Sequence, residues 1–224
     1  PARLVAPRTW AISDSGSDVF YLVCGDQKAL FIDVGFGFAN LPALAQALLP
    51  EGLPLQVVNT HGHPDHAWGN WQFDEVFIGA GDQFLVSDPL PEKRRLAIIA
   101  DTRTKIPPEW AVDLEFLNRW GSRHPARIHT VENGFCFELG GRNLEVIELP
   151  GHTPGGICLL DRTNRLLFSG DGLHPGHIWL QLRESLPMRA YYENLVQFHR
   201  RWQGSFDLIL WGHSQDPAPA ATVP

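Results

Sequence analysis

The sequence predicts a mixed α/β fold in which two β-sheets pack face to face and helices cover their outer sides. Short runs rich in β-branched and aromatic residues dominate both halves of the chain, and each half also contains helical patterns. Strands and helices do not alternate regularly along the chain. Two packed sheets with helices outside them is therefore the arrangement that buries the apolar faces of all these elements.

Length and composition fit a single domain spanning residues 1–224. The chain is 44% apolar and 19% charged, which is enough apolar material for a core. Its net charge of −7 has the wrong sign for nucleic acid or an anionic membrane, and no apolar run is long enough to cross a bilayer. We therefore expect a small-molecule substrate, with no nucleic-acid or membrane partner. The oligomeric state is left open.

The first half of the chain is strand-rich. The expected strands are Thr9–Ser13, Val19–Cys24, Lys28–Val34, Leu55–Asn59 and Glu75–Gly79. A helix is expected at Leu41–Leu49, because leucines recur there at helical spacing and Pro42 suits a first turn.

Strands resume in the second half. The expected strands are Arg127–Val131, Gly134–Leu139, Asn143–Leu149, Ile157–Asp161, Leu166–Ser169 and Phe206–Trp211. Between the last two, Met188–Trp202 has one apolar stripe and is expected to form an amphipathic helix.

A helical insertion is expected at about residues 87–125. It contains two helical patterns, about Glu92–Ala100 and Glu109–Trp120, separated by Pro107-Pro108. The segment is locally basic, which is consistent either with a lid whose arginines favour an anionic substrate or with a solvated helical face. The Pro/Ala-rich end, about residues 215–224, is expected to be a disordered tail.

The three cysteines, Cys24, Cys136 and Cys158, are widely spaced and form no disulfide framework. Each lies in an apolar run, so we interpret them as small buried hydrophobic residues. This pattern favours a reducing compartment, and we expect a cytoplasmic protein. The chain does not begin with Met, which leaves room for a removed export signal.

A dense cluster of polar side chains follows the expected strand that ends at Asn59. In the run THGHPDH, His61 and His63 are two residues apart and can reach one point from an extended segment. Asp65 and His66 follow as the chain turns and can face a second point nearby. Imidazole and carboxylate groups are ligands that zinc, iron and manganese accept. Burying these groups without an ion would be costly, so the cluster predicts a metal site.

Three more strand-terminal loops carry a candidate ligand. They are the turn PGHTPGG with His152, the turn SGDG with Asp171, and the turn WGHS with His213. A single His in a glycine-rich turn is usually structural. Loops that gather at one edge of a rigid scaffold are, however, where catalytic groups usually lie, and all four elements in order favour a metal centre.

These four motifs resemble those of the metallo-β-lactamase-fold superfamily of metallohydrolases, over about residues 9–213. The resemblance implies a four-layer αββα sandwich with two metal ions at one edge. The first ion would be bound by His61, His63 and His152, and the second by Asp65, His66 and His213, with Asp171 bridging the two.

The resemblance also implies the chemistry. Two divalent cations, zinc first and iron or manganese as alternatives, would hold a hydroxide that attacks an ester, thioester or lactone-type bond. Asp65 would orient this hydroxide. A bridging carboxylate at Asp171 resembles glyoxalase II and the lactonases. True β-lactamases of the superfamily generally have Cys or Ser there, so β-lactam hydrolysis is expected only as a side activity.

Two other functions stay open. Persulfide dioxygenases are similar in motif and use one non-haem iron, which would be held here by His61, His152 and Asp171. A binding module without turnover is disfavoured, because an intact ligand set is costly to keep buried.

Histidines and tryptophans near the motifs allow further hypotheses. His174 or His177, just after Asp171, would donate a hydrogen bond to the substrate or protonate the leaving group, or else both are surface residues. Five tryptophans suit either the mouth of a cavity or the core. They are Trp68, Trp71, Trp110, Trp120 and Trp179.

Overall fold

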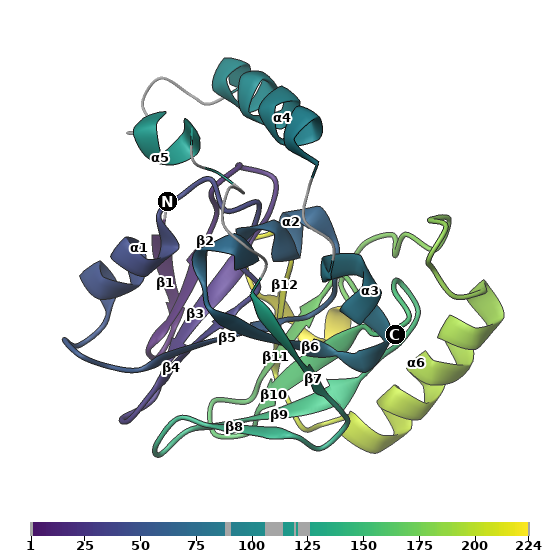
Figure 1. The fold of residues 1–224 in the computed structure, drawn as a ribbon. Helices are drawn as coiled ribbons and strands as arrows, with labels where there is room; N and C mark the ends of the chain where they lie inside the picture. The colour runs from purple at the N-terminus through teal and green to yellow at the C-terminus, as the bar shows by residue number, and fades with distance from the viewer. Residues whose placement is uncertain (1, 88–90, 106–113, 119, 121–125, 224) are drawn as a thin grey trace.

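Two β-sheets form the centre of the molecule, and helices lie on the outer side of each (Figure 1). The structure is a computed structural model that describes residues 2–87, 91–105, 114–118, 120 and 126–223.

The first sheet has seven strands in sequential order. They are β1 (Ala2–Ala6), β2 (Thr9–Ile12), β3 (Phe20–Cys24), β4 (Ala29–Ile32), β5 (Leu55–Asn59), β6 (Glu75–Gly79) and β7 (Arg127–Val131). Strands β1 to β4 are antiparallel neighbours, whereas β4 to β7 are parallel. Strand β1 was not predicted from the sequence, because it is short, with five residues, and most of them are exposed.

The second sheet has six strands in the order β13-β12-β11-β10-β9-β8. They are β8 (Cys136–Glu138), β9 (Asn143–Glu148), β10 (Ile157–Asp161), β11 (Leu166–Gly170), β12 (Leu208–Trp211) and β13 (Ala218–Pro219). Only β11 and β12 pair in parallel; the other neighbours are antiparallel.

Six α-helices and three 3₁₀ turns are found in the described residues. They are α1 (Leu41–Leu48), α2 (Pro64–Ala67), α3 (Gln83–Val86), α4 (Glu92–Lys105), α5 (Leu114–Asn118), α6 (Met188–Trp202), η1 (Trp68–Gln72), η2 (Ala80–Asp82) and η3 (Ala220–Thr222). Helices α1 and α6 lie on opposite sides of the pair of sheets (Figure 1). None of the helices in these ranges combines the length and the apolar character needed to cross a membrane.

Alternation along the strands builds the four layers. In β3, Tyr21 and Val23 join the core between the sheets, whereas Phe20 and Leu22 face the layer of α1. In β10, Leu159 joins the same central core, and Cys158 packs with α6. Because neighbouring strand residues point to opposite faces, each sheet is buried on both sides. The predicted αββα sandwich is confirmed.

The insertion contains two helices, as predicted, but with different bounds. Helix α4 continues to Lys105, and α5 occupies Leu114–Asn118, the part of the second expected helix that is described apart from Trp120. The Pro107-Pro108 break lies outside the described residues. Arg95 of α4 donates to the carbonyl of Asn118, the last residue of α5, at 3.3 Å and to that of Trp120 at 3.0 Å, which joins the two helices.

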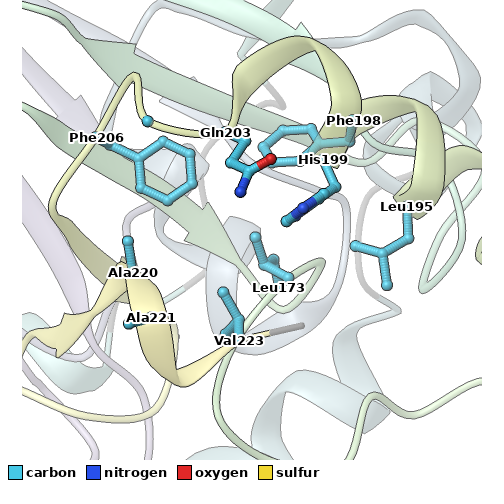
Figure 2. A pocket seen from close by; sticks show the side chains of 10 residues that line it. Leu173, Leu195, Phe198, His199, Gln203, Phe206, Ala220, Ala221 and Val223 are labelled. Carbon is cyan, nitrogen blue, oxygen red and sulfur yellow. The ribbon is translucent and has the colours of Figure 1, made fainter.

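The prediction of a disordered tail is wrong for residues 215–223. Strand β13 pairs with β12, and η3 follows it. Ala220 and Val223 pack against the apolar cluster that contains Phe198 and Phe206. Figure 2 shows these four residues around a hollow beside α6, of about 370 Å³, which His199 and Gln203 also line. The edge of β12 and this apolar surface give the tail hydrogen bonds and burial that its composition did not reveal.

The cysteine interpretation holds for two of the three residues. Cys24 and Cys158 are buried, and burial raises the pKa of the Cys158 thiol to about 12. Cys136 is exposed. It lies on β8, a strand at the end of the second sheet with only β9 as a neighbour, so its apolar sequence context was misleading.

Arg142 and Asp161 form a buried ion pair in the second sheet, and the same guanidinium contacts the first sheet. Arg142, which is 5% exposed, donates through Nε to Oδ2 of the fully buried Asp161 at 2.7 Å. Its other nitrogens donate to Thr9 Oγ1 and to the carbonyls of Pro7 and Arg8, at 2.8 to 3.2 Å. Burial lowers the pKa of Arg142, although Asp161 opposes this effect. The guanidinium therefore connects the β9–β10 side of one sheet to the start of β2 in the other.

Removing this guanidinium should destabilise the protein strongly. We expect Arg142→Ala to lower the free energy of unfolding by about 3–5 kcal/mol, because Asp161 would stay buried without its partner. The matched control is Arg189→Ala, whose pair with Glu193 is exposed on α6, and which should cost less than about 1 kcal/mol. Urea unfolding measures both values. A similar loss in the two variants would contradict this role for Arg142.

Candidate metal centre

Strand direction brings the predicted ligands to one edge of the sandwich. Strands β4 and β5 are parallel, so Asp33 and His61, which follow them, emerge at the same edge. In the second sheet β11 and β12 are parallel, so Asp171 and His213 also emerge together. Strand β9 runs in the same direction as β11, since both are antiparallel to β10, and His152 follows it.

All seven predicted ligands lie in three overlapping groups. Within each group, one ligand atom from every residue lies within 4.8 Å of the others. The groups are His61–His63–His152, His61–His66–Asp171 and Asp65–His66–His213.

The local sequence explains how one short run reaches two points. His63 is extended, with φ −70° and ψ 155°, and Pro64 then begins helix α2. Proline suits the first helical position because it has no N–H to satisfy. The turn carries Asp65 and His66 away from the point that His61 and His63 share. Gly212 packs against this turn, since a Cβ there would lie 2.4 Å from His66 Cε1 and 2.5 Å from Asp171 Oδ1.

Each histidine of the centre has one ring nitrogen held by a partner outside the cluster. Nδ1 of His66, His152 and His213 lies 2.7 to 2.8 Å from Asp33 Oδ2, the Trp179 carbonyl and the Ser17 carbonyl, respectively. These contacts favour a proton on Nδ1 and direct Nε2 of each ring toward the cluster. His63 is reversed: Nε2 lies 2.7 Å from Glu184 Oε1, and Nδ1 lies 2.9 Å from His152 Nε2.

Asp33 connects the two halves of the centre, which are the groups His61–His63–His152 and Asp65–His66–His213. Its Oδ1 accepts from the backbone N–H of Thr60 at 2.7 Å, and its Oδ2 accepts from Thr60 Oγ1 at 2.8 Å as well as from His66. Thr60 Oγ1 lies 3.1 Å from His61 Nδ1. Because the Thr60 proton goes to Asp33, the hydroxyl oxygen can accept from His61, whose Nε2 then faces the cluster.

The donor set fits metal ions. His61 Nε2, His66 Nε2 and Asp171 Oδ1 are buried and have no hydrogen-bond partner. Buried polar atoms without a partner are rare and costly. These three atoms are the members of one group that could hold an ion, and nitrogen and carboxylate oxygen are suitable ligands for zinc, iron or manganese.

The charges of the cluster are strongly coupled. Burial lowers the pKa of His61 well below its ordinary value, and neighbouring imidazoles add to this effect. Burial alone would raise the pKa of Asp171, but His66 and His213 hold it well below the usual range. The hydrogen bond with Asp171 raises the pKa of His213 to about 9. The centre therefore combines an anionic carboxylate at Asp171 and a neutral ring at His61 with two rings, His66 and His213, whose pKa values are raised by their carboxylate neighbours. A metal ion would displace the protons of these two rings on binding.

A cleft of about 580 Å³ opens onto the centre. Its lining residues are His63, Pro64, Asp65, His152, Asp171, His174, His177, Trp179, Leu182, Glu184 and His213. Trp179 is 60% exposed and, with Leu182, forms an apolar part of the wall. A small molecule could reach both ligand groups from this side.

Most of the tryptophans serve packing instead. Trp71 and Trp120 form an apolar cluster with Ile99 of α4 and Phe116 of α5, and Trp68 packs against it. None of the described residues of the insertion lines the cleft, so their placement does not support the lid interpretation. Trp110 lies outside the described residues.

His174 and His177 both line the cleft. His174 stacks on Trp211, with ring centroids 6.4 Å apart and an angle of 16° between the planes. Burial lowers the pKa of His174, so the ring is neutral at pH 7. A neutral imidazole at this position can donate a hydrogen bond to a ligand.

Sequence reasoning missed three acidic residues that support the centre. Asp82, which is fully buried, accepts from Gly62 N at 2.9 Å and from Gly155 N at 2.6 Å, and so joins the two loops of the first group. Asp33 and Asp82 could have been found by the signal that found Asp171, an Asp just after a strand. Glu184 lies in a loop with no such signal.

The comparisons with known proteins agree with this geometry. Residues 16–213 match the family described as the metallo-beta-lactamase superfamily. The chain belongs to this superfamily. It is a metallo-hydrolase, as the motifs predicted.

The relatives include thioester-cleaving enzymes. An acyl-coenzyme A thioesterase, MBLAC2, of Gallus gallus is 34% identical over 86% of this chain and 71% of its own length. The hydroxyacylglutathione hydrolase GloC of Haemophilus influenzae is 31% identical over 78% of this chain and 74% of its own. A solved structure, TTHA1623 in a di-iron-bound form, is 24% identical, with a TM-score of 0.64 over 95% of this chain and 94% of its own. This last likeness concerns the fold.

The loop from Ser13 to Asp18 supports His213 in this metallo-hydrolase, because the Ser17 carbonyl accepts from its Nδ1. The loop itself contains two buried carboxyl groups, Asp14 and Asp18, which are 7% and 1% exposed. Asp14 Oδ1 and Asp18 Oδ2 have no partner outside the pair, and both lie beside Gly35. Burial and the neighbouring Asp18 raise the pKa of Asp14 well above its ordinary value.

Replacing Asp14 should therefore change how stability depends on pH. A carboxyl whose pKa is raised on folding destabilises the native state as the pH rises from about 4 toward that raised pKa. Asp14→Asn keeps an oxygen for the N–H groups of Phe38 and Ala39 and can donate to Asp18. We expect the variant to exceed the parent in stability by about 1 kcal/mol or more at pH 8, with the difference vanishing near pH 4.

Chemical denaturation across this pH range makes the measurement. The control Glu51→Gln removes an exposed carboxyl and should follow the parent curve. A constant difference between Asp14→Asn and the parent at every pH would contradict the assignment.

Proposed function

We propose that this protein hydrolyses small acyl thioesters at a centre of two divalent metal ions, zinc first. The observation that carries this proposal is the set of three overlapping ligand groups at the floor of an open cleft. Two of the groups share no residue, and the third draws on both and adds Asp171. A mononuclear site would leave one of the two separate groups without a function.

The proposed roles follow these groups. One ion would be held by His61, His63 and His152, the other by Asp65, His66 and His213, and the Asp171 carboxylate would contribute to both sites. Asp171 Oδ2 is 3.0 Å from His213 Nε2 and 3.7 Å from His152 Nε2, so one carboxylate reaches both sets.

Such a pair of ions lowers the pKa of water and stabilises negative charge that develops on the substrate. The protein's own groups then orient the reactants. The Asp65 carboxylate lines the cleft, with Oδ2 at 3.6 Å from both His66 Nε2 and His213 Nε2. From this position it can accept a hydrogen bond from the attacking water. Neutral His174 is placed to donate a hydrogen bond to the thioester carbonyl or to the leaving group.

The relatives favour thioesters over other acyl compounds. MBLAC2 is named an acyl-coenzyme A thioesterase, and GloC is named a hydroxyacylglutathione hydrolase; both names describe cleavage of a thioester. Esters and lactones differ from thioesters in the leaving group and present the same carbonyl to the cleft. β-Lactam turnover is proposed only as a side activity.

Metal content and thioester turnover test the proposal together. Protein purified without added metal or chelator should contain about two divalent ions per chain by elemental analysis. It should release thiol from acyl-coenzyme A or acyl-glutathione, and the activity should disappear after chelation and return with zinc. About one iron per chain, with persulfide-dependent oxygen uptake and no thioester hydrolysis, would overturn the proposal in favour of the dioxygenase alternative.

The role of His174 in turnover can be tested separately from metal binding. We expect His174→Ala to lower kcat about 10- to 100-fold, because a hydrogen bond to the reacting group is lost, while metal content stays at the parent value. His177→Ala, from the same cleft wall, is the matched control and should lower kcat by less than about threefold. Unchanged turnover in His174→Ala would remove this residue from the mechanism.

A further inference from the structure

We propose that Glu184 is a positioning residue that orients His63 as a ligand of the first metal ion. The inference rests on the proposed dinuclear centre and concerns a residue outside its ligand set. In four of the five histidines, Nδ1 is the ring nitrogen that contacts a partner outside the ligand cluster. In His63 this nitrogen is Nε2.

The contact of Glu184 with His63 is close and well shielded. Glu184 Oε1 lies 2.7 Å from His63 Nε2, and the two side chains are 24% and 12% exposed. Glu184 accepts the Nε2 proton, so the lone pair at Nδ1 is directed toward His152 Nε2, 2.9 Å away. A ring rotated by half a turn about Cβ–Cγ would place Cδ2–H where Nδ1 lies, and a proton on Nδ1 would occupy the lone pair; either change would abolish binding by His63.

Each half of the centre contains one histidine whose outer ring nitrogen is hydrogen-bonded to a carboxylate. In the second half, Asp33 holds Nδ1 of His66 at 2.8 Å. In the first half, the outer partners are the Thr60 hydroxyl, the Trp179 carbonyl and Glu184. Carboxylate partners raise the basicity of a ligating imidazole and fix its orientation. Glu184 is therefore the counterpart of Asp33 for the first ion.

Glu184 belongs to a loop, residues 172–187, that is attached to the first half of the centre. Ser185 Oγ donates to the His152 carbonyl at 2.8 Å, and Leu186 N donates to the Gly151 carbonyl at 2.8 Å. The same loop provides the Trp179 carbonyl for His152 and the cleft wall at His174 and Leu182. It therefore joins the wall of the cleft to two ligands of one ion.

Zinc affinity of the purified protein tests this inference. We expect Glu184→Ala to weaken the binding of one of the two ions by about 10- to 100-fold in competition with a chromophoric chelator, because loss of such a partner typically costs this much. Binding of the second ion should stay within about twofold. Glu184→Gln keeps an oxygen that can accept from Nε2 and should restore most of the affinity.

Two further variants distinguish the loss of the Glu184 carboxylate from the loss of an exposed carboxylate and from the loosening of the loop. Glu193→Ala removes an exposed carboxylate of α6, paired with Arg189 at 3.0 Å, and should bind both ions as the parent does. Ser185→Ala loosens the loop without touching His63. Equal loss of zinc affinity in Ser185→Ala and Glu184→Ala would overturn the inference, because loop attachment would then account for it. Parent-like affinity in Glu184→Ala would overturn it directly.

Histidine NMR adds a readout that does not depend on metal or turnover. In metal-free protein with ¹⁵N-labelled histidine, the proton on His63 Nε2 should be visible and slow to exchange, and it should be lost in Glu184→Ala. Its absence from the parent spectrum would overturn the inference. A parent protein that binds no zinc but shows this proton would instead overturn the proposed function and leave the Glu184–His63 contact established.

Discussion

The hydrogen bonds of Asp33 are the interaction on which the rest of the centre depends. One buried carboxylate at the end of β4 holds the backbone and hydroxyl of Thr60 and the ring of His66. Through Thr60 it also sets the ring of His61. Two histidines from different ligand groups are thus oriented from one side chain. Asp33 itself has φ +62°, an uncommon value for a residue other than glycine, and this strain is tolerated where the surrounding contacts determine the conformation.

The same principle extends around the centre. Imidazole rings bind an ion only when the ligating nitrogen is deprotonated and correctly directed, so every ring needs an outer partner. These partners come from both sheets and from three loops: Ser17 before β3, Thr60 after β5, and Trp179 and Glu184 between β11 and α6. Such a set cannot form in any local segment. The site is consequently a product of the whole sandwich, including the hydrogen bonds of Arg142 to Thr9, Pro7 and Arg8 that join the two sheets.

The wall of the cleft differs in polarity from its floor. The floor is polar, with ligands that range from the buried His66 to the exposed His213, whereas the wall formed by residues 172–187 is partly apolar and exposed at Trp179. This division suits a substrate with a reactive carbonyl and a less polar body. Different segments thus have different functions. Strand ends hold the candidate metal ligands rigidly, and a single loop shapes the space for the substrate.

The layers and the candidate ligands could be predicted from the sequence. Apolar runs predicted β5, β6 and β10, and helical spacing predicted α6, with the bounds observed. β-branched and aromatic runs favour buried strands, and a period of 3.6 marks the buried face of a helix. The seven candidate ligands stood out because polar residues clustered at strand ends. Tertiary structure alone decided the outer partners. Glu184 is distant from His63 in the chain, and the partners at Ser17 and Trp179 are backbone carbonyls, which carry no sequence signal. It also decided the order of the tail, since an available strand edge and an apolar surface beside α6 lie far from it in sequence.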